Sequence, residues 1–194
     1  MSRRRVRVVV LCEGFRDFRF AYSCLVTCGW RSDQIAAKVS PKGRGSAFSY
    51  VLDNYPAEVR ANRDSRERTL LVLIDADNQP EGGREAQLAQ RLQEVDEKPR
   101  QARERIALWV PRRQLETWIC FLMHGGADEE TDYKREHHLS EEERKLAAKQ
   151  FAQFLKKGRA LPSGAVPSMK KAVVEFGRLR ASPSRGAQSS TRRR

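Results

Sequence analysis

Three acidic residues stand directly after predicted strands, where α/β proteins gather their functional side chains. Glu13 follows the apolar run 6–12, and Asp75 and Asp77 follow the run 70–74. Because the carboxyl ends of parallel strands meet at one edge of a sheet, we expect these three carboxylates to converge. In an extended segment, Asp75 and Asp77 would also point to the same side, since they are two residues apart.

Converging carboxylates repel one another and are costly to remove from water unless a divalent cation neutralises them. Ligand sets made only of oxygen select hard ions, so Mg²⁺ or Mn²⁺ is the expected cofactor in preference to zinc. Such ions support phosphoryl transfer by activating water and stabilising charge on phosphate oxygens. The structural alternative is that Glu13 caps the helix after it, while Asp75 and Asp77 form a solvated turn.

The elements that must position these acids alternate between strands and helices. The runs 6–12 and 70–74 are almost continuously apolar, as in buried strands, and a third strand over 105–110 ends at Pro111. Helical spacing of apolar residues predicts helices from Phe15 to Gly29, Ala47 to Tyr55, over 84–95, Leu115 to His124, from the capping box of Ser140 and Glu143 to Leu155, and from Met169 to Leu179. This order predicts an α/β fold with a mainly parallel sheet covered by helices on both faces.

The length of 194 residues suits one domain of about 150 residues with short appendages. We expect an α/β domain over 1–124, a helical extension over 125–180, and a disordered basic tail over 181–194, which lacks apolar periodicity. No apolar run approaches the roughly 18 residues of a membrane span, and the basic N-terminus lacks a signal-peptide cleavage pattern. No membrane association and a cytoplasmic location are therefore expected.

The chain is strongly basic, with 38 Lys and Arg against 25 Asp and Glu and a formal net charge of +13. Residues 1–7 and 181–194 each carry four Arg and no acid. Basic ends indicate a polyanion partner, most often nucleic acid, although they also aid solubility. The candidate nucleic-acid contacts are Lys42 and Arg44 in a glycine-rich loop, Arg112 and Arg113 after the third strand, and Arg192, Arg193 and Arg194 in the tail. A solvated basic turn is the alternative for the pair at 112–113.

The cysteines and histidines indicate no competing chemistry. Cys12, Cys24, Cys28 and Cys120 form no Cys-x-x-Cys pair, so we expect reduced thiols that pack as small hydrophobic residues. The three His have no ligand-like spacing, and no Ser/His/Asp or Cys/His nucleophile pattern appears. Trp30 and Trp109 are expected in the core.

Two segments resemble the motifs of TOPRIM domains. The strand followed by Glu13-Gly14-Phe15-Arg16-Asp17 resembles their first motif, in which an apolar strand delivers Glu-Gly, then an acid and a helix. The later strand ending in Asp75-Ala76-Asp77 resembles their Asp-x-Asp motif. The resemblance covers about residues 6–120 and implies a TOPRIM-like, Rossmann-like sheet.

A third segment narrows this resemblance. Pro111, Glu116 and Trp118 after the last strand resemble small stand-alone TOPRIM-like proteins of bacterial defence loci, related to the overcoming-lysogenization-defect nucleases. The resemblance implies that Glu13 is a metal ligand and general acid/base, that Asp75 and Asp77 are metal ligands, and that Glu116 is a further ligand. The alternative for Glu116 is a surface residue near a helix start, which the helix dipole favours.

These observations leave three functions open. The first is a metal-dependent nuclease acting on DNA or RNA in anti-phage defence, alone or as a subunit with a partner ATPase, since the chain contains no ATPase domain. The second is a non-catalytic nucleic-acid-binding subunit of a larger complex. A phosphatase-like Asp-x-Asp enzyme ranks last, because that chemistry places Asp-x-Asp after the first strand, where this chain has Glu13.

Overall fold

The structure is a computed structural model that describes residues 6–41, 43, 46–65, 67–77, 79–156 and 159–180. Within these residues, four strands form one all-parallel sheet in the order β2-β1-β3-β4, which confirms the predicted α/β class. The strands are β1 (Val8–Cys12), β2 (Ile35–Val39), β3 (Thr69–Leu73) and β4 (Ile106–Trp109). β1 and β3 lie side by side with Cys12 opposite Leu73, so their carboxyl ends coincide.

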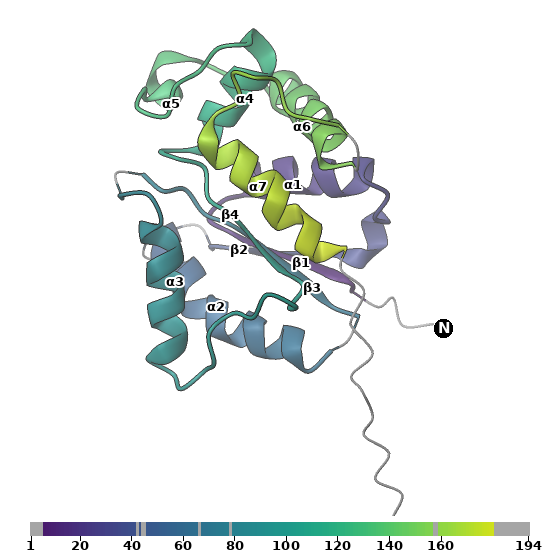
Figure 1. Ribbon diagram of the computed structural model, residues 1–194, viewed down its shortest axis with the longest axis vertical. Coiled ribbons are helices and arrows are strands. Elements are labelled where there is room, and N and C mark those ends of the chain that lie inside the picture. Colours follow the sequence, from purple (N-terminus) through teal and green to yellow (C-terminus); the bar gives the residue numbers. More distant parts are fainter. Residues whose placement is uncertain are drawn as a thin grey trace, which may run out of the picture.

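Helices cover both faces of the sheet (Figure 1). They are α1 (Phe15–Thr27), α2 (Ala47–Arg63), α3 (Gly83–Gln93), α4 (Leu115–His124), α5 (Tyr133–Glu136), α6 (Glu141–Leu155) and α7 (Pro167–Leu179), with a 3₁₀ turn at Ser32–Gln34. α2 and α3 pack on one face and α1, α4, α6 and α7 on the other. No helix in the described part of the chain is long and apolar enough to cross a membrane.

The strands are buried on both faces because successive side chains enter different hydrophobic clusters. In β1, Val8, Val10 and Cys12 join the cluster under α1, α4, α6 and α7, while Val9 and Leu11 join the cluster under α2 and α3. This explains why the strand sequences are continuously apolar instead of alternating. The sheet is therefore a rigid platform whose carboxyl edge presents the loops after β1, β3 and β4.

Two elements differ from the sequence expectation. β2 was not expected, because its sequence Ile35-Ala-Ala-Lys-Val39 has few β-branched residues and lies partly exposed at the sheet edge. α2 was expected to stop at Tyr55, but it continues through Pro56 to Arg63. Tertiary packing of buried Val59 and the ion pairs of Arg63 with Glu97 and Glu104 offset the lost backbone hydrogen bond at the proline.

Residues 125–180 contain the helices expected there, and α6 and α7 share a hydrophobic cluster with the sheet. The capping box of Ser140 and Glu143 at the start of α6 is confirmed, since Glu143 N donates to Ser140 Oγ at 3.1 Å. The aromatic rings of Trp109 and Phe151 pack with their centroids 5.4 Å apart. The predicted tail over 181–194 lies outside the described residues.

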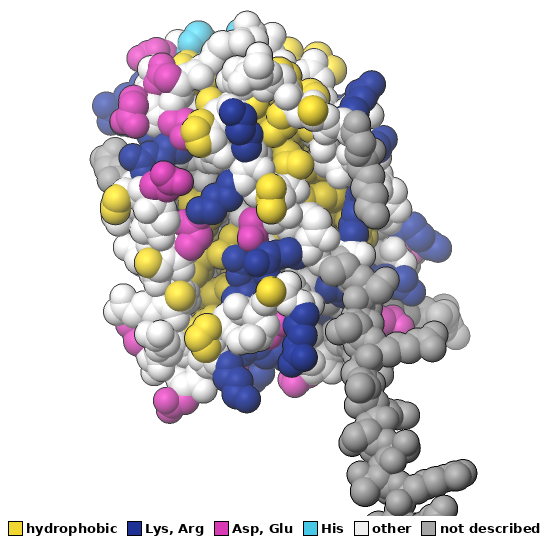
Figure 2. All heavy atoms as spheres, viewed as in Figure 1, with side chains coloured by type: hydrophobic (Ala, Val, Ile, Leu, Met, Phe, Trp, Pro, Cys, Tyr) yellow, Lys and Arg dark blue, Asp and Glu magenta, His cyan; other side chains and the backbone are white. Residues whose placement is uncertain are grey.

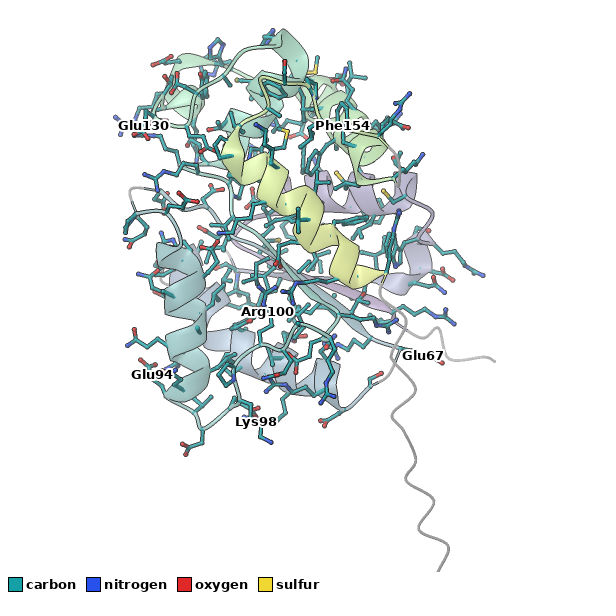
Figure 3. The ribbon with its side chains drawn as sticks, in the orientation of Figure 1. Glu67, Glu94, Lys98, Arg100, Glu130 and Phe154 are labelled. Atoms are coloured by element: carbon teal, nitrogen blue, oxygen red, sulfur yellow. The ribbon has the colours of Figure 1, made fainter. Side chains whose placement is uncertain are left out.

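The outer edge of β4 is covered by side chains. Glu175 of α7 accepts a hydrogen bond from Leu108 N at 2.9 Å, and Arg100 donates to Ile106 O at 3.0 Å. Arg100 and Glu175 also form an ion pair with each other, and Arg100 lies beside α7 in Figure 3. The pair satisfies backbone groups that an open sheet edge would leave exposed to other chains.

The cysteines are free thiols that pack in or beside the core, and the two tryptophans expected in the core also pack there. All four cysteines are free thiols, with Cys12, Cys24 and Cys120 buried and Cys28 half-buried. Cys24 Sγ donates to Ala148 O at 3.2 Å, which ties α1 to α6. Trp109 is fully buried, and Trp30 packs at the rim of the core.

Candidate active site

Glu13 and Asp75 meet at the carboxyl edge of the sheet. Each follows the end of its strand, and β1 and β3 are neighbours with their ends in register. The carboxylate of Glu13 accepts a hydrogen bond from the backbone N–H of Asp75, with 3.2 Å between Oε1 and N. Adjacent parallel strands thus bring together two acids that are 62 residues apart in the sequence.

Asp77 departs from the extended geometry expected for the Asp-x-Asp segment. Its φ of 50° lies in the left-handed region, which Asp tolerates better than most residues. Asp77 N donates to Arg113 O at 2.8 Å, and Arg113 itself has a φ of 52°. The Asp77 side chain is 60% exposed and pairs with Arg84, whose Nη2 lies 2.6 Å from Oδ2. Asp77 therefore turns outward from the axis of β3.

Arg84, in the first turn of α3, holds the Asp-x-Asp segment in place. Its Nε donates to Asp75 O at 2.9 Å while Nη2 binds Asp77. The arginine side chain is only 6% exposed and lies with its guanidinium carbon 3.8 Å from the centre of the Phe48 ring. One buried cation thus fixes both the backbone and a carboxylate of the segment, which nothing in the sequence spacing indicated.

Asp75 also caps a helix across the sheet edge. Its Oδ1 accepts a hydrogen bond from Leu115 N at 3.0 Å, at the first residue of α4. The cap residue of that helix, Gln114, makes no side-chain cap of its own and instead donates to Asp132 at 2.7 Å. A carboxylate at a helix N-terminus satisfies a free N–H group and interacts favourably with the helix dipole.

Glu116 lies in the first turn of the same helix and is buried. Its Oε1 is 2.9 Å from Nη1 of Arg144 in α6, and the two side chains are 8% and 12% exposed. After burial, which is the largest cause, the charge of Glu116 also raises the pKa values of Asp17 and Asp75. The structure thus gives Glu116 a cationic partner, and its predicted role as a metal ligand stays a prediction.

Asp17 is a fifth carboxylate at this edge. Its Oδ2 accepts a hydrogen bond from Gly14 N at 2.9 Å, at the start of α1. The sequence motif after β1 contained this acid without assigning it a role. Glu13, Asp17, Asp75, Asp77 and Glu116 are hereafter called the carboxylate cluster.

Burial and mutual repulsion shift the protonation of the carboxylate cluster. Removal from water, with the charges of Asp17 and Asp77, raises the pKa of Glu13 to about 7 against the hydrogen bond from Asp75 N. Removal from water and the charge of Glu116 raise the pKa of Asp17 to about 6. Burial and the surrounding acids also raise the pKa of Asp75 well above its usual value. Burial, and after it the charges of neighbouring acids, therefore favour the protonated forms of these carboxyl groups when no cation is bound.

The chemistry of these donors suits a hard divalent cation. Glu13 Oε2, Asp17 Oδ1 and Asp75 Oδ2 receive no hydrogen bond from any described residue. Across the same part of the chain, however, no three His, Cys, Asp or Glu side chains already converge in an arrangement that could hold a metal ion. The donor types fit Mg²⁺ or Mn²⁺, and coordination would require side-chain rotation, above all of Asp77, which pairs with Arg84.

The predicted nucleic-acid contacts that the structure describes are engaged within the protein. Arg112 donates to Gln79 O at 2.6 Å, and Arg113 lies 3.7 Å from Asp132. Lys42, Arg44, Arg192, Arg193 and Arg194 lie outside the described residues. On the face shown in Figure 2, basic and acidic side chains are interspersed. That face therefore presents no broad patch of a single charge.

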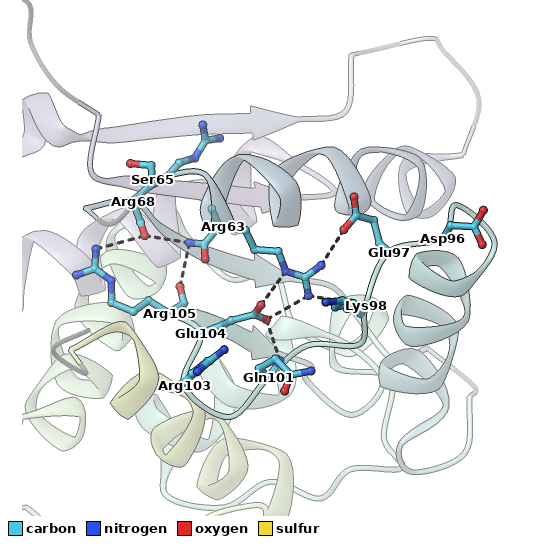
Figure 4. Close-up of a pocket in the computed structure, with 11 residues that line it drawn as sticks. Arg63, Ser65, Arg68, Asp96, Glu97, Lys98, Gln101, Arg103, Glu104 and Arg105 are labelled. Atoms are coloured by element: carbon cyan, nitrogen blue, oxygen red, sulfur yellow. Dashed lines mark hydrogen bonds and ion pairs between the residues drawn. The ribbon is translucent and has the colours of Figure 1, made fainter. Parts of the chain in front are cut away.

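One cavity lies away from the carboxylate cluster. About 850 Å³ in volume, it is enclosed by the end of α2 and the segment 96–105 at the opposite edge of the sheet (Figure 4). Arg63 occupies it and donates to both Glu97 and Glu104, at 2.8 and 2.7 Å. Lys98, on its rim, and Glu130, which pairs with Arg112 at 4.0 Å, lie at opposite ends of the molecule (Figure 3). The ion pairs of Arg63 in this cavity join the end of α2 to the segment 96–105.

Comparison with known proteins adds no assignment. No protein-family model matches the chain, and searches of curated proteins and of solved structures found no match. The function must therefore be argued from the carboxylate cluster itself.

Proposed function

We propose that the chain is a nuclease that depends on Mg²⁺ or Mn²⁺ and hydrolyses phosphodiester bonds of DNA or RNA at the carboxylate cluster. The single observation that carries this proposal is the contact between Glu13 and Asp75 at the carboxyl ends of adjacent parallel strands. Parallel α/β sheets bind their ligands at this edge. Burial, and after it the charges of neighbouring acids, raise the pKa values of Glu13 and Asp75, and such perturbed groups cluster at functional sites.

The residues of the carboxylate cluster divide the chemical tasks. Asp75 and Asp17 would hold the cation, and Glu116 and a rotated Asp77 would complete its ligands. When bound, the cation supplies charge stabilisation for the phosphate oxygens and an activated water. Glu13 lies beside the other acids and accepts a hydrogen bond at Oε1 from Asp75 N, so its Oε2 is suited to accept a proton from water or to deliver one to the leaving oxygen.

The proposed partners are a polyanion substrate and an ATPase, and the proposed location is the cytoplasm. A formal net charge of +13 favours a polyanion substrate and offsets the acidic character of the site. The resemblance to TOPRIM proteins of defence loci supports a role against phage and a partner ATPase. Four free thiols suit the reducing cytoplasm, where we place the activity.

A second candidate is a nucleic-acid-binding subunit without catalysis. The observation that favours it is that several acids already have structural tasks. Asp75 caps α4, Asp77 pairs with Arg84, and Glu116 pairs with Arg144. An inactive descendant of a nuclease would retain these contacts because the fold needs them.

Incubation of the purified chain with supercoiled plasmid, single-stranded DNA and RNA separates the two candidates. We expect cleavage with Mg²⁺ or Mn²⁺ that EDTA abolishes, and a loss of orders of magnitude in Glu13→Ala and Asp75→Ala. Far-ultraviolet circular dichroism shows whether each variant is folded. Variants that cut as fast as wild type contradict the nuclease, and binding without cleavage, with candidate ATPase partners present, supports the subunit.

A further inference from the structure

An aromatic ridge runs along α1 away from the carboxylate cluster. It consists of Phe15, Phe18 and Tyr22, whose spacing of three and four residues places them on one side of the helix. The ring centres of Phe15 and Phe18 are 6.5 Å apart, and those of Phe18 and Tyr22 are 5.7 Å apart. Because consecutive Cα atoms are about 3.8 Å apart, the Cα of Phe15 lies within about 7.6 Å of that of Glu13. The ridge therefore begins at the site.

Phe15 is held in place but not covered. Its side chain is 63% exposed, and it is the one aromatic among the exposed large hydrophobic side chains of the described residues. Phe18, which packs against the core, meets it at an interplanar angle of 90°. In a perpendicular pair, at least one face of each ring stays free of its neighbour. Phe15 thus offers an open aromatic face on a rigid helix.

Arginines alternate with these aromatic residues. Arg16 is exposed and forms no ion pair with any residue that the structure describes. Arg19 is 68% exposed and pairs with Glu141 at 3.0 Å. Exposed aromatic rings next to cationic side chains are the combination with which proteins bind single-stranded nucleic acid, through stacked bases and phosphate contacts. A duplex buries its base faces, so it offers nothing for Phe15 to stack on.

We propose that the aromatic ridge stacks unpaired bases of single-stranded DNA or RNA and thereby guides the strand to the carboxylate cluster. The choice of nucleic acid as the ligand rests on the proposed nuclease function, and the aromatic ridge narrows the substrate of that nuclease to single strands. The ridge extends about 10 Å along the helix from Phe15 to Tyr22, since each residue advances about 1.5 Å. Phe15 is the exposed ring that stacks a base, the half-buried Phe18 and Tyr22 support it along the helix, and Arg16 is placed to neutralise a phosphate beside it.

Fluorescence anisotropy with labelled oligothymidylate, oligouridylate and a DNA duplex tests this proposal in EDTA, where no cleavage occurs. Removing one stacking ring costs about 1–3 kcal/mol, so Phe15→Ala should weaken single-strand binding about 5- to 150-fold. Phe15→Trp should retain the affinity. Val174→Ala, at a side chain that is 76% exposed on α7, is the matched control and should change nothing.

The salt dependence distinguishes the ring from the cation. Phe15→Ala should leave the slope of log affinity against log salt unchanged, because it removes no phosphate contact. Arg16→Gln should flatten that slope by at most about 0.7 for one lost contact with a single strand. Duplex affinity should be unaffected in Phe15→Ala, and thermal melting should show that each variant is as stable as wild type.

Unchanged single-strand binding in Phe15→Ala, or an equal loss for single strands and duplex, would overturn the proposal. Wild-type chain that binds no oligonucleotide would overturn it as well. If Phe15→Ala instead abolished self-association on gel filtration while binding stayed unchanged, the ring would belong to a protein contact. If single strands bind through Phe15 but no metal-dependent cleavage occurs, the nuclease proposal fails and the proposal for the aromatic ridge stands. If cleavage occurs but binding does not depend on Phe15, the nuclease proposal stands and the proposal for the aromatic ridge fails.

Discussion

Glu13→Gln should make the metal-free chain more stable at alkaline pH, although it removes a central residue of the site. In the folded chain, burial and the charges of Asp17 and Asp77 raise the pKa of Glu13 from an ordinary 4.5 to about 7. As pH rises between these values, the unfolded chain loses this proton before the folded chain does. Stability therefore falls across that window. Glutamine carries no charge, and its Oε1 can still accept the hydrogen bond from Asp75 N.

The size of this effect follows from the two pKa values. Each tenfold change in proton affinity is about 1.4 kcal/mol, so ionised Glu13 costs the folded chain at most about 3 kcal/mol at pH 8. Water and counterions reduce the cost at this sheet edge, and we expect a gain of about 1–3 kcal/mol for Glu13→Gln. For a chain of this length, each kcal/mol raises the melting temperature by about 2–4 °C.

Thermal melts in EDTA at pH 8 and pH 4.5 measure this gain. We expect Glu13→Gln to melt at least about 3 °C above wild type at pH 8 and close to it at pH 4.5, where the difference nearly vanishes. Glu142→Gln, at an exposed acid on α6, is the control and should shift stability by less than about 0.5 kcal/mol. A Glu13→Gln melting temperature at or below that of wild type at pH 8 would refute repulsion within the carboxylate cluster.

Three further predictions address the ion pairs and the tail. Glu116→Gln leaves Arg144 buried without its partner and should lower the free energy of unfolding by about 3 kcal/mol in urea titrations. The double variant Glu116→Gln/Arg144→Met should recover most of this loss. Equal stability of the single and double variants would contradict the prediction. Glu175→Ala unpairs Arg100 and Leu108 N and should cost about 2–4 kcal/mol at pH 7. Burial raises the pKa of Glu175, but the hydrogen bonds from Arg100 and Leu108 N outweigh it and lower that pKa. The contribution of Glu175 to the free energy of unfolding is therefore present above about pH 4.5 and is lost as pH falls further. A stability difference between wild type and Glu175→Ala that stays constant from pH 7 to pH 3 would argue against the pairing. Deletion of 181–194 should flatten the salt dependence of nucleic-acid binding by at most about 0.9 log units for each lost phosphate contact, and an unchanged slope would leave the tail a solubility role.

The helices and strands with a clear apolar periodicity could be predicted from the local sequence. The helix Leu115–His124 has the bounds expected, because Pro111 ends the strand region before it and Gly125, with a φ of 78°, ends it. β2 escaped notice because its pairing with β1 is a tertiary fact and Ala36 and Ala37 carry no strand signal. The full length of α2 escaped for the same reason, since the contacts that continue it past Pro56 come from distant segments.

For the candidate site too, some contacts could be predicted from the sequence and others could not. The meeting of Glu13 with Asp75 could be foreseen, because buried parallel strands fix where their carboxyl ends lie. The cations that hold the acids could not be foreseen, because no sequence pattern links Arg84 and Arg144 to the acids with which they pair. Likewise, the left-handed backbone of Asp77 arises from its hydrogen bond to Arg113 O across the loops, not from the Asp-x-Asp pattern.

Direct titration with Mn²⁺ tests the central claim, that the carboxylate cluster holds a divalent cation. Isothermal calorimetry at pH 8 should show saturable Mn²⁺ binding to wild type and strongly reduced binding to Asp75→Asn. Binding to wild type should be weaker at pH 5.5, where protons compete for the ligand Asp17 and neutralise Glu13 beside it. Glu142→Gln should bind as wild type does. Wild type that binds no Mn²⁺ at pH 8, or Asp75→Asn that binds it with the same affinity, would contradict the assignment of the cluster as a metal site.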